Sequence, residues 1–295
     1  MFPTRELPAS RDDLRAWVAT VVECGFDHII AADHVLGLDP SGGTEWAEGW
    51  PHPLEFRKPY TVSDVFHEPF VLFGWMAALC DLELVTGVLV LPQRQAVLTA
   101  KQAAEIDVLT DGKLRLGVGV GWNRGEYDAL GVPFSKRGAL IEEQIALMCE
   151  LWTNETVDFG GEFHEVHHAG LQMLPVQQPI PIWIGGDAPA VLERVGRLAD
   201  GWTCSARETP GDEFDHKVRT IREAAERVGR APASIGIECR QIVVHDDGEF
   251  RERLDSWRSV DGLTHMAIDT MNVGRRTLDE HTTALRRAAD ALALT

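Results

Sequence analysis

Strand and helix patterns alternate along almost the whole chain. Short apolar segments with the length of a buried strand cover residues 28–32, 82–91, 114–120, 179–186, 201–205, 234–244 and 264–269. Helical patterns lie mostly between and after them, over residues 68–80, 94–109, 135–152, 188–198, 212–228, 248–257 and 275–292. This alternation predicts parallel strands joined by crossover helices. With one more strand at the N-terminus the chain would have eight strand–helix units, the number that closes a TIM barrel.

The N-terminal strand is the weakest element of this pattern. Phe2 is at most the stub of a strand, so the first strand is very short or missing. Ser10 then predicts the start of a helix, with Asp13 at the capping-box spacing, and Gly25 predicts its end. We expect a single α/β TIM-barrel domain over residues 1–295. An open doubly wound sheet is the alternative.

Two long segments interrupt the pattern. Residues 35–67 form an irregular stretch, and a loop of this length in a compact domain is usually functional. Its apolar content suits a lid or the wall of a pocket, and the residues concerned are Trp46, Trp50, Pro51, Pro53, Phe56, Pro59 and Tyr60. The second segment, about 153–178, contains a predicted β-hairpin whose turn is Gly160-Gly161.

Composition limits the class of partner. A formal net charge of −18 disfavours nucleic acid and anionic membranes, and no apolar run approaches the roughly 18 residues that span a bilayer. The five cysteines are scattered without a C-x-x-C pair, so neither a disulfide framework nor a zinc site is indicated. We expect a cytoplasmic protein that binds a small molecule. An anionic ligand would need a local basic patch, for which the candidates are Arg94, Lys101, Lys113 and Arg115.

The segment Leu114–Leu130 has glycine at alternate positions in the second half of its strand. Glycine allows another group to approach the backbone closely, and the turn into the next helix leaves N–H groups that suit an anion. The dinucleotide pattern G-x-G-x-x-G fails, because its third glycine would fall on Trp122 or Arg124. The strand is therefore either the floor of a ligand site or a tightly packed strand with small residues for steric reasons.

In a TIM barrel the active site lies at the C-terminal ends of the strands. Two of the predicted ends are rich in glycine and precede helices, so their N–H groups could bind a phosphate. The candidate site residues selected in this way are Asp33, His34, Thr86, Gly87, Val88, Gly119, Gly121, Trp122, Asn123, Gly185, Gly186, Asp187, Cys204 and Ser205.

His34 is the best candidate for proton transfer, because the pKa of imidazole lies near neutrality. The alternative is a structural histidine at the strand end. Asp33 could accept a hydrogen bond from a heterocyclic N–H or bind the loop backbone. Glu126 is either a second acid or a surface carboxylate, and a surface position is favoured. Cys204 is expected to be buried and inert.

A second group of histidines follows the predicted hairpin. His164, His167 and His168 have no carboxylate at metal-ligand spacing. We interpret them as loop residues.

Three segments carry a family resemblance: GFDHIIAADH, PIPIWIGGDAP and the block from LELVTGVLVL to GWNRGEYDALG. They resemble the bacterial luciferase-like monooxygenase superfamily, in particular its coenzyme F420 (deazaflavin)-dependent oxidoreductases. The resemblance covers nearly the whole chain. It implies a TIM barrel with an inserted hairpin, usually a dimer, and a flavin or deazaflavin that lies across the mouth of the barrel.

The same resemblance implies roles by position. Asp33-His34 match the residues beside the cofactor ring, with His34 at the proton-handling position. Thr86-Gly87-Val88 match a strand bulge under the ring, often with a non-prolyl cis peptide. Gly119 and Gly121–Asn123 match the cofactor-binding strand end, and Gly185-Gly186 match the phosphate-binding turn.

The resulting hypothesis is an F420-dependent oxidoreductase that transfers a hydride between the deazaflavin and a small organic substrate. An FMN-dependent monooxygenase is the first alternative. A cofactor-free binding protein on the same barrel is an alternative from another class, since the first strand is so short. The loop over residues 35–67 varies within the family and gives no substrate.

Overall fold

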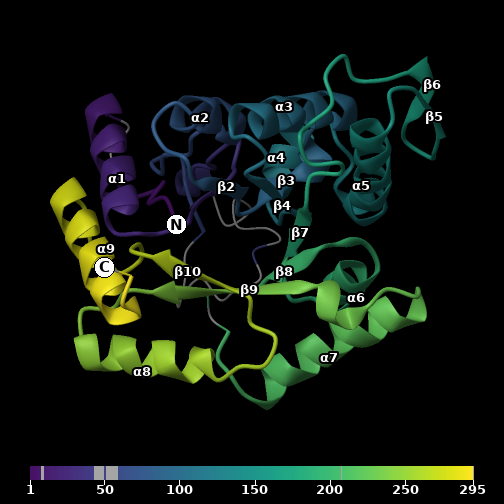
Figure 1. Ribbon diagram of the computed structural model, residues 1–295. Coiled ribbons are helices and arrows are strands. Elements are labelled where there is room, and N and C mark those ends of the chain that lie inside the picture. Colours follow the sequence, from purple (N-terminus) through teal and green to yellow (C-terminus); the bar gives the residue numbers. More distant parts are fainter. Residues whose placement is uncertain (8–9, 43–49, 51–58, 207, 295) are drawn as a thin grey trace.

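The computed structural model describes residues 1–7, 10–42, 50, 59–206 and 208–294. A parallel sheet runs through it in the order β1-β2-β4-β7-β8-β9-β10, and β3 pairs with β4. Its strands are β1 (His28–Ala31), β2 (Glu83–Thr86), β3 (Leu89–Val90), β4 (Leu114–Gly119), β7 (Ile182–Gly185), β8 (Gly201–Thr203), β9 (Gly236–Ile242) and β10 (His265–Asp269) (Figure 1). The predicted alternation of parallel strands and crossover helices is thus confirmed.

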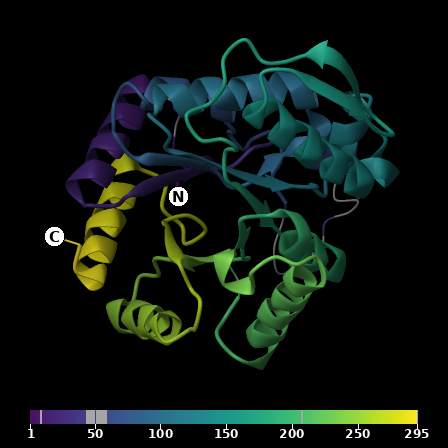
Figure 2. The same ribbon diagram turned by 45° about the vertical axis from the view of Figure 1, so that its right-hand side comes forward.

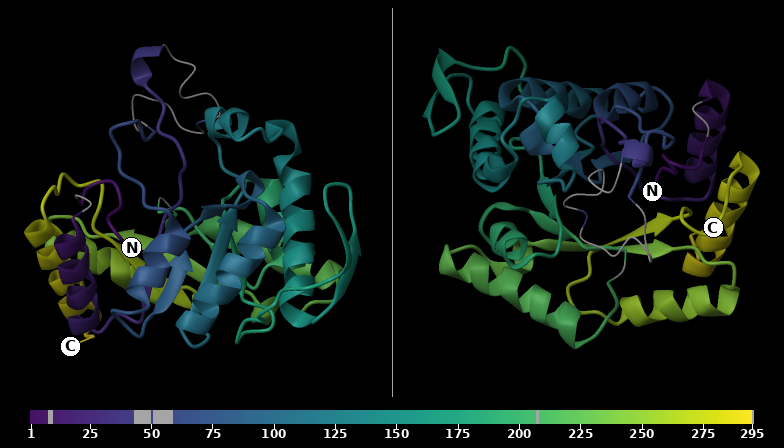
Figure 3. Two further views of the ribbon diagram at one scale, coloured as in Figure 1. Left: turned by 90° about the horizontal axis from the view of Figure 1, so that it is seen from above. Right: turned by 180° about the vertical axis from the view of Figure 1, so that it is seen from behind.

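The helices lie around the outside of these strands (Figure 2). They are α1 (Arg11–Glu23), α2 (Pro69–Met76), α3 (Ala96–Leu109), α4 (Arg124–Ala129), α5 (Arg137–Thr153), α6 (Pro189–Leu198), α7 (Asp212–Arg227), α8 (Asp247–Arg258) and α9 (Leu278–Leu292). In the described residues no helix is both long and apolar enough to cross a membrane. Figure 3 shows the segment after β1, through the 3₁₀ turn η1 (Pro40–Gly42), projecting beyond the rest of the described chain.

The N-terminal residues nearly close the barrel. The backbone N–H of Phe2 donates to the carbonyl of Ile30 in β1 at 2.7 Å, and the Met1 nitrogen donates to the carbonyl of Ile268 in β10. These two residues therefore occupy the place of the short first strand expected from the sequence. The arrangement is a nearly closed TIM barrel, and the alternative of an open doubly wound sheet is wrong.

Helix α1 begins and ends where its sequence predicts. The Ser10 hydroxyl accepts a hydrogen bond from the N–H of Asp13 at 3.3 Å, and Gly25 follows the helix with a φ of +75°. The apolar face of the helix is buried, with Trp17 and Val18 at its centre. Burial of such a stripe holds the helix against the barrel.

The segment over residues 82–91 is not one strand. β2 ends at Thr86, the Gly87–Val88 peptide bond is cis, and the chain resumes as β3. A Cβ atom on Gly119 or Gly185 would lie 2.7 Å from a methyl group of Val88. A Cβ atom on Gly117 would lie 1.9 Å from the carbonyl oxygen of Thr86. The glycines of β4 and β7 thus make room for the interrupted strand, as the steric interpretation predicts.

Gly185→Ala is expected to lower the free energy of unfolding by about 1–3 kcal/mol, because the new methyl group would press on Val88. Val88→Ala removes the obstructing atoms, so the double variant should lose less than the sum of the two single losses. Urea unfolding of the wild type and the three variants measures this coupling. Additive losses would mean that Gly185 is a glycine for another reason.

The inserted hairpin consists of β5 (Val157–Gly160) and β6 (Glu165–Ala169). The predicted two-glycine turn is wrong, because Gly160 ends β5 and residues 161–164 form the turn. The Glu143 carboxylate of α5 accepts hydrogen bonds from the N–H groups of Glu162, Phe163 and His164. This one carboxylate fixes the turn against α5.

The histidines of this region are only partly as predicted. His164 lies in the turn, and its Nδ1 is 2.8 Å from the Glu143 carboxylate. His167 and His168 belong to β6 rather than to a loop, and they pair with Glu165 and Asp158.

The predicted basic patch is wrong. Arg115 is buried among the strands, where it pairs with Glu238 at 3.1 Å and Glu83 at 3.0 Å. Its guanidinium carbon lies 4.4 Å from the ring centre of Trp183. Lys113 pairs with Asp81 on the surface. These cations are neutralised within the barrel and at its edge. Neither they nor Arg94 and Lys101 line the cavity described below.

His281 of α9 makes the fold sensitive to acid. The side chain is fully buried, and its Nδ1 lies 2.8 Å from the Thr270 hydroxyl. Burial, with the nearby Arg275, lowers its pKa from 6.5 to about 4. As the pH falls, His281 therefore takes up a proton in the unfolded chain at a higher pH than in the folded protein. The stability from neutral His281 is therefore complete above about pH 6.5 and is lost progressively toward pH 4.

His281→Gln is expected to reduce the loss of stability between pH 7 and pH 5, since glutamine does not titrate. Urea unfolding of both proteins at the two pH values measures the effect. The same change with His216, which is exposed on α7, serves as the control. An equal loss in the wild type and His281→Gln would contradict this account.

Candidate active site

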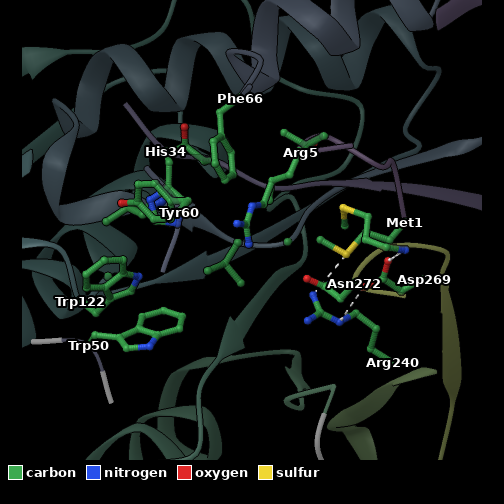
Figure 4. Close-up of a pocket in the computed structure, with 18 residues that line it drawn as sticks. Met1, Arg5, His34, Trp50, Tyr60, Phe66, Trp122, Arg240, Asp269 and Asn272 are labelled. Atoms are coloured by element: carbon green, nitrogen blue, oxygen red, sulfur yellow. Dashed lines mark hydrogen bonds and ion pairs between the residues drawn. The ribbon is translucent and has the colours of Figure 1, made fainter. Parts of the chain in front are cut away.

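A cavity of about 240 Å³ lies where the C-terminal ends of the strands meet (Figure 4). His34 follows β1, Val88 lies between β2 and β3, and Trp122 follows β4, whereas Asp269 ends β10. Segments far apart in the sequence therefore converge on one space, as the barrel predicts.

One half of the cavity is aromatic. The rings of His34 and Tyr60 lie with centres 3.9 Å apart, and Phe66 meets the His34 ring edge-on at 5.0 Å. Trp122 and Trp50 extend this wall, with ring centres 4.8 Å apart. The residues of the long loop that the structure describes here therefore form a pocket wall, in agreement with the prediction. Trp46, Pro51, Pro53 and Phe56, also assigned to this wall, lie outside the described residues.

Glu126 lies directly behind His34. Its carboxylate is 3.3 Å from His34 Nδ1, and it accepts hydrogen bonds from the N–H of Val35 at 2.9 Å and of Leu36 at 3.1 Å. The Gln93 amide also donates to it, at 3.0 Å. Burial alone would raise the pKa of Glu126, but these bonds hold it below its ordinary value. The preferred surface position of Glu126 is thus wrong, because this carboxylate is completely buried.

Asn123 connects the aromatic wall to α4. Its side-chain oxygen accepts from the N–H of Glu126 at 3.4 Å and so caps the helix. Its amide nitrogen donates to the Tyr60 hydroxyl at 2.7 Å. The single asparagine therefore fixes Tyr60 relative to the helix that carries Glu126.

Asp33 is held by an ion pair. Arg94 donates to one carboxylate oxygen at 2.9 Å and to the other at 3.2 Å, and the N–H of Val90 donates to the second oxygen at 3.2 Å. Arg94 also pairs with Glu68 at 3.0 Å. These bonds fix the chain after β3 against the end of β1.

The structure brings together part of the predicted set. The predicted residues that line the cavity are Asp33, His34, Gly87, Val88, Gly121 and Trp122. Thr86, Gly119, Asn123 and Gly185 pack behind these residues, and Thr86 donates to the carbonyl of Gly117 at 2.7 Å. Cys204 is buried as expected, and burial raises the pKa of its thiol.

The predicted phosphate-binding turn stands apart from the cavity wall. Gly186 is exposed, with a φ of +122°, and its carbonyl accepts from the Trp202 indole at 2.8 Å. Lys217 of α7 lies near this turn, 4.0 Å from Asp187. It is also bonded to Glu208 at 2.6 Å and lies 3.1 Å from Glu213. The positive charge beside the turn is thus offset by carboxylates.

Sequence reasoning missed the polar half of the cavity. It is formed by Arg5 from the N-terminal segment, Arg240 from β9, and Asp269 and Asn272 at the end of β10. The N-terminal segment is too short for periodicity to be read, and Arg240 lies inside a strand rather than at its end. Asp269 ends β10, so the rule that active-site residues lie at the C-terminal ends of strands could have identified it.

Comparison with known proteins gives the family context. A model described as luciferase-like monooxygenase matches residues 3–294. An uncharacterised protein of Mycobacterium tuberculosis is 34% identical over 200 residues, which are 68% of this chain and 63% of that protein. The F420-dependent glucose-6-phosphate dehydrogenase of Amycolatopsis mediterranei is 28% identical over 222 residues, 72% of this chain and 59% of that enzyme. The chain thus spans about three fifths of the length of these curated relatives.

Among solved structures, a monooxygenase from Streptomyces bottropensis superposes with a TM-score of 0.78. The superposition covers 99% of this chain and 97% of that one, at 18% sequence identity. At this identity the likeness concerns the fold.

Proposed function

The chain belongs to the luciferase-like monooxygenase family, whose members are oxidoreductases and monooxygenases, and we propose that it is an F420-dependent oxidoreductase acting on a small organic substrate. The observation that carries the proposal is the aromatic cavity in which His34 is backed by the buried Glu126. A proton-handling side chain beside an apolar wall suits hydride transfer at a planar ring.

The cavity fits a planar cofactor ring. Gly87, Val88 and Gly121 line the cavity, and Val88 would support one face of a ring. Tyr60 and Trp122 would contact its apolar edge. The main chain at Gly185-Gly186 would bind the phosphate group. The deazaflavin, when bound, supplies the hydride or accepts it.

His34 would handle the proton that accompanies the hydride. Its Nδ1 faces Glu126, so Nε2 remains for the cavity. The Glu126 carboxylate would orient the imidazole ring. Asp33 would act as a positioning residue, since its carboxylate already binds Arg94.

One observation favours FMN as the alternative cofactor. The lysine beside the Gly185-Gly186 turn, Lys217, is surrounded by Asp187, Glu208 and Glu213. F420 carries a long acidic tail that these carboxylates would repel, whereas FMN carries a single phosphate. FMN in this cavity would make the protein a flavin-dependent monooxygenase.

Titration with F420 and with FMN, followed by absorbance and fluorescence, tests the proposal. We expect F420 to bind with a micromolar Kd or tighter. Micromolar binding of FMN without binding of F420 would replace the proposal by the monooxygenase. Binding of neither would favour a cofactor-free binding protein.

A homodimer is part of this proposal. Apolar side chains are exposed along α2 and α3, among them Val71 at 75%, Leu98 at 50% and Leu109 at 51%. A second copy of the chain would cover this face. Light scattering of the wild type and of Leu98→Asp tests it, with a monomeric variant as the expected result.

The five free cysteines agree with a cytoplasmic location.

A further inference from the structure

Two guanidinium groups line the cavity beside and opposite the aromatic wall. Figure 4 shows the Arg5 side chain reaching toward the middle of the cavity, with Arg240 beyond it, near Asn272 and Asp269. The two arginines come from distant parts of the sequence, the N-terminal segment and β9. Neither is used by the proton-handling residues described above.

Arg240 is incompletely satisfied. Within the described part of the chain, its Nε is buried without a hydrogen-bond partner and lies 3.6 Å from Asp269 Oδ2, beyond hydrogen-bond distance. That oxygen, on a fully buried side chain, is likewise unpartnered among the described residues. Among the described residues, Nη1 donates only to a weak acceptor, the Met1 sulfur, at 3.2 Å. Buried N–H groups of this kind require an acceptor.

Arg5 is anchored from one side. Its Nε donates to Asp64 Oδ1 at 2.8 Å, and Asp64 is itself held by the N–H of Thr61 at 2.6 Å. Among the residues that the structure describes, the hydrogen bonds of Arg5 involve Nε alone. Its terminal nitrogens are thus directed at the cavity with donors to spare (Figure 4).

The charges beside this part of the cavity are of both signs. Asp64 lies beside Arg5 and Asp269 beside Arg240, and the Glu6 carboxylate accepts from the N–H of Asn272 at 2.9 Å. Asp64 Oδ1 accepts its hydrogen bond from Arg5 Nε. An acidic oxygen group in the cavity would then receive charge-assisted hydrogen bonds from both guanidinium groups.

We infer that Arg5 and Arg240 form a subsite for an anionic oxygen group, a carboxylate or a phosphate, and that the substrate carries it. The rest of the substrate would be apolar or aromatic, because the opposite wall is formed by Tyr60, Phe66 and Trp122. The inference rests on the proposed function, and it names the substrate class for that site.

Calorimetric titration with benzoate and with benzamide tests the subsite. The two molecules share size and ring, but only benzoate is charged. We expect benzoate to bind the wild type at least about tenfold more tightly than benzamide. Arg240→Gln and Arg5→Gln should each abolish this preference and leave the affinity for benzamide unchanged. Arg240→Lys, which keeps the charge, should retain part of it.

Arg253→Gln, on the exposed surface of α8, is the matched control and should behave like the wild type. Thermal melting establishes that each variant is folded, and Arg5→Gln and Arg240→Gln probe the subsite from separate elements. Equal binding of benzoate and benzamide, or no binding of benzoate, would overturn the inference.

The anionic group at this subsite could belong to the substrate or to the cofactor phosphate. The affinities for FMN and riboflavin, which differ by one phosphate, distinguish the two. We expect Arg240→Gln to leave the ratio of their affinities unchanged. A selective loss of FMN affinity would place the cofactor phosphate here and overturn the assignment to the substrate. Failure of both F420 and FMN to bind, with the benzoate preference intact, would overturn the proposed function and support the subsite.

Discussion

His34→Ala is expected to lower turnover by about 10²-fold or more while the barrel remains folded. The side chain is 17% exposed and lines the cavity, so its removal leaves the core intact. His34 has a ring nitrogen that can carry a proton and a buried carboxylate partner, Glu126. Among the described residues of the aromatic half, no other side chain has both, so none can replace it. Steady-state kinetics with the bound cofactor, together with thermal melting, measures both effects.

The exposed His216→Ala is the control for His34→Ala and should keep the wild-type rate. A wild-type rate in His34→Ala would rule out the proton role. A large fall in melting temperature would instead identify His34 as a structural residue at the strand end.

Glu126→Ala should lower the free energy of unfolding by about 3 kcal/mol or more. The change removes the acceptor for two backbone N–H groups and the Gln93 amide, and each buried donor left unpaired costs about 1–3 kcal/mol. Urea unfolding measures the loss. An effect below about 1 kcal/mol would show that water replaces the carboxylate.

Glu126→Gln separates stability from catalysis. Glutamine keeps one acceptor oxygen and the volume of the side chain, so the variant should fold, but it removes the charge beside His34. We expect kcat to fall about tenfold or more with little change in KM, the pattern of an interaction used in the transition state. An unchanged kcat would limit Glu126 to a structural role.

Local sequence patterns predicted the barrel well because its determinants are local. Strand length, helix periodicity and the caps at Ser10 and Gly25 depend on neighbouring residues, and the alternation of elements follows from them. The strand-end rule placed His34 and Trp122 at the cavity for the same reason.

The partners of charged side chains could not be predicted in this way. Glu126 binds an N–H group 91 positions away in the chain, and Arg115 pairs with a glutamate 123 positions away. A carboxylate in the first turn of a short helix is ordinarily exposed, so only the folded chain shows that Glu126 is buried. The same holds for Arg240, whose place in a strand gave no sign that it faces the cavity.

The join between β10 and β1 has a consequence for how the molecule opens. In the described chain Met1 and Phe2 bridge the two strands through one main-chain hydrogen bond to each, whereas β9 and β10 share a register of five residue pairs. Transient local opening of the barrel should begin where Met1 and Phe2 connect β10 and β1, because few hydrogen bonds hold the strands there. Amide protons of β1 and β10 that face this join would exchange with deuterium earlier than those at the centre of β4.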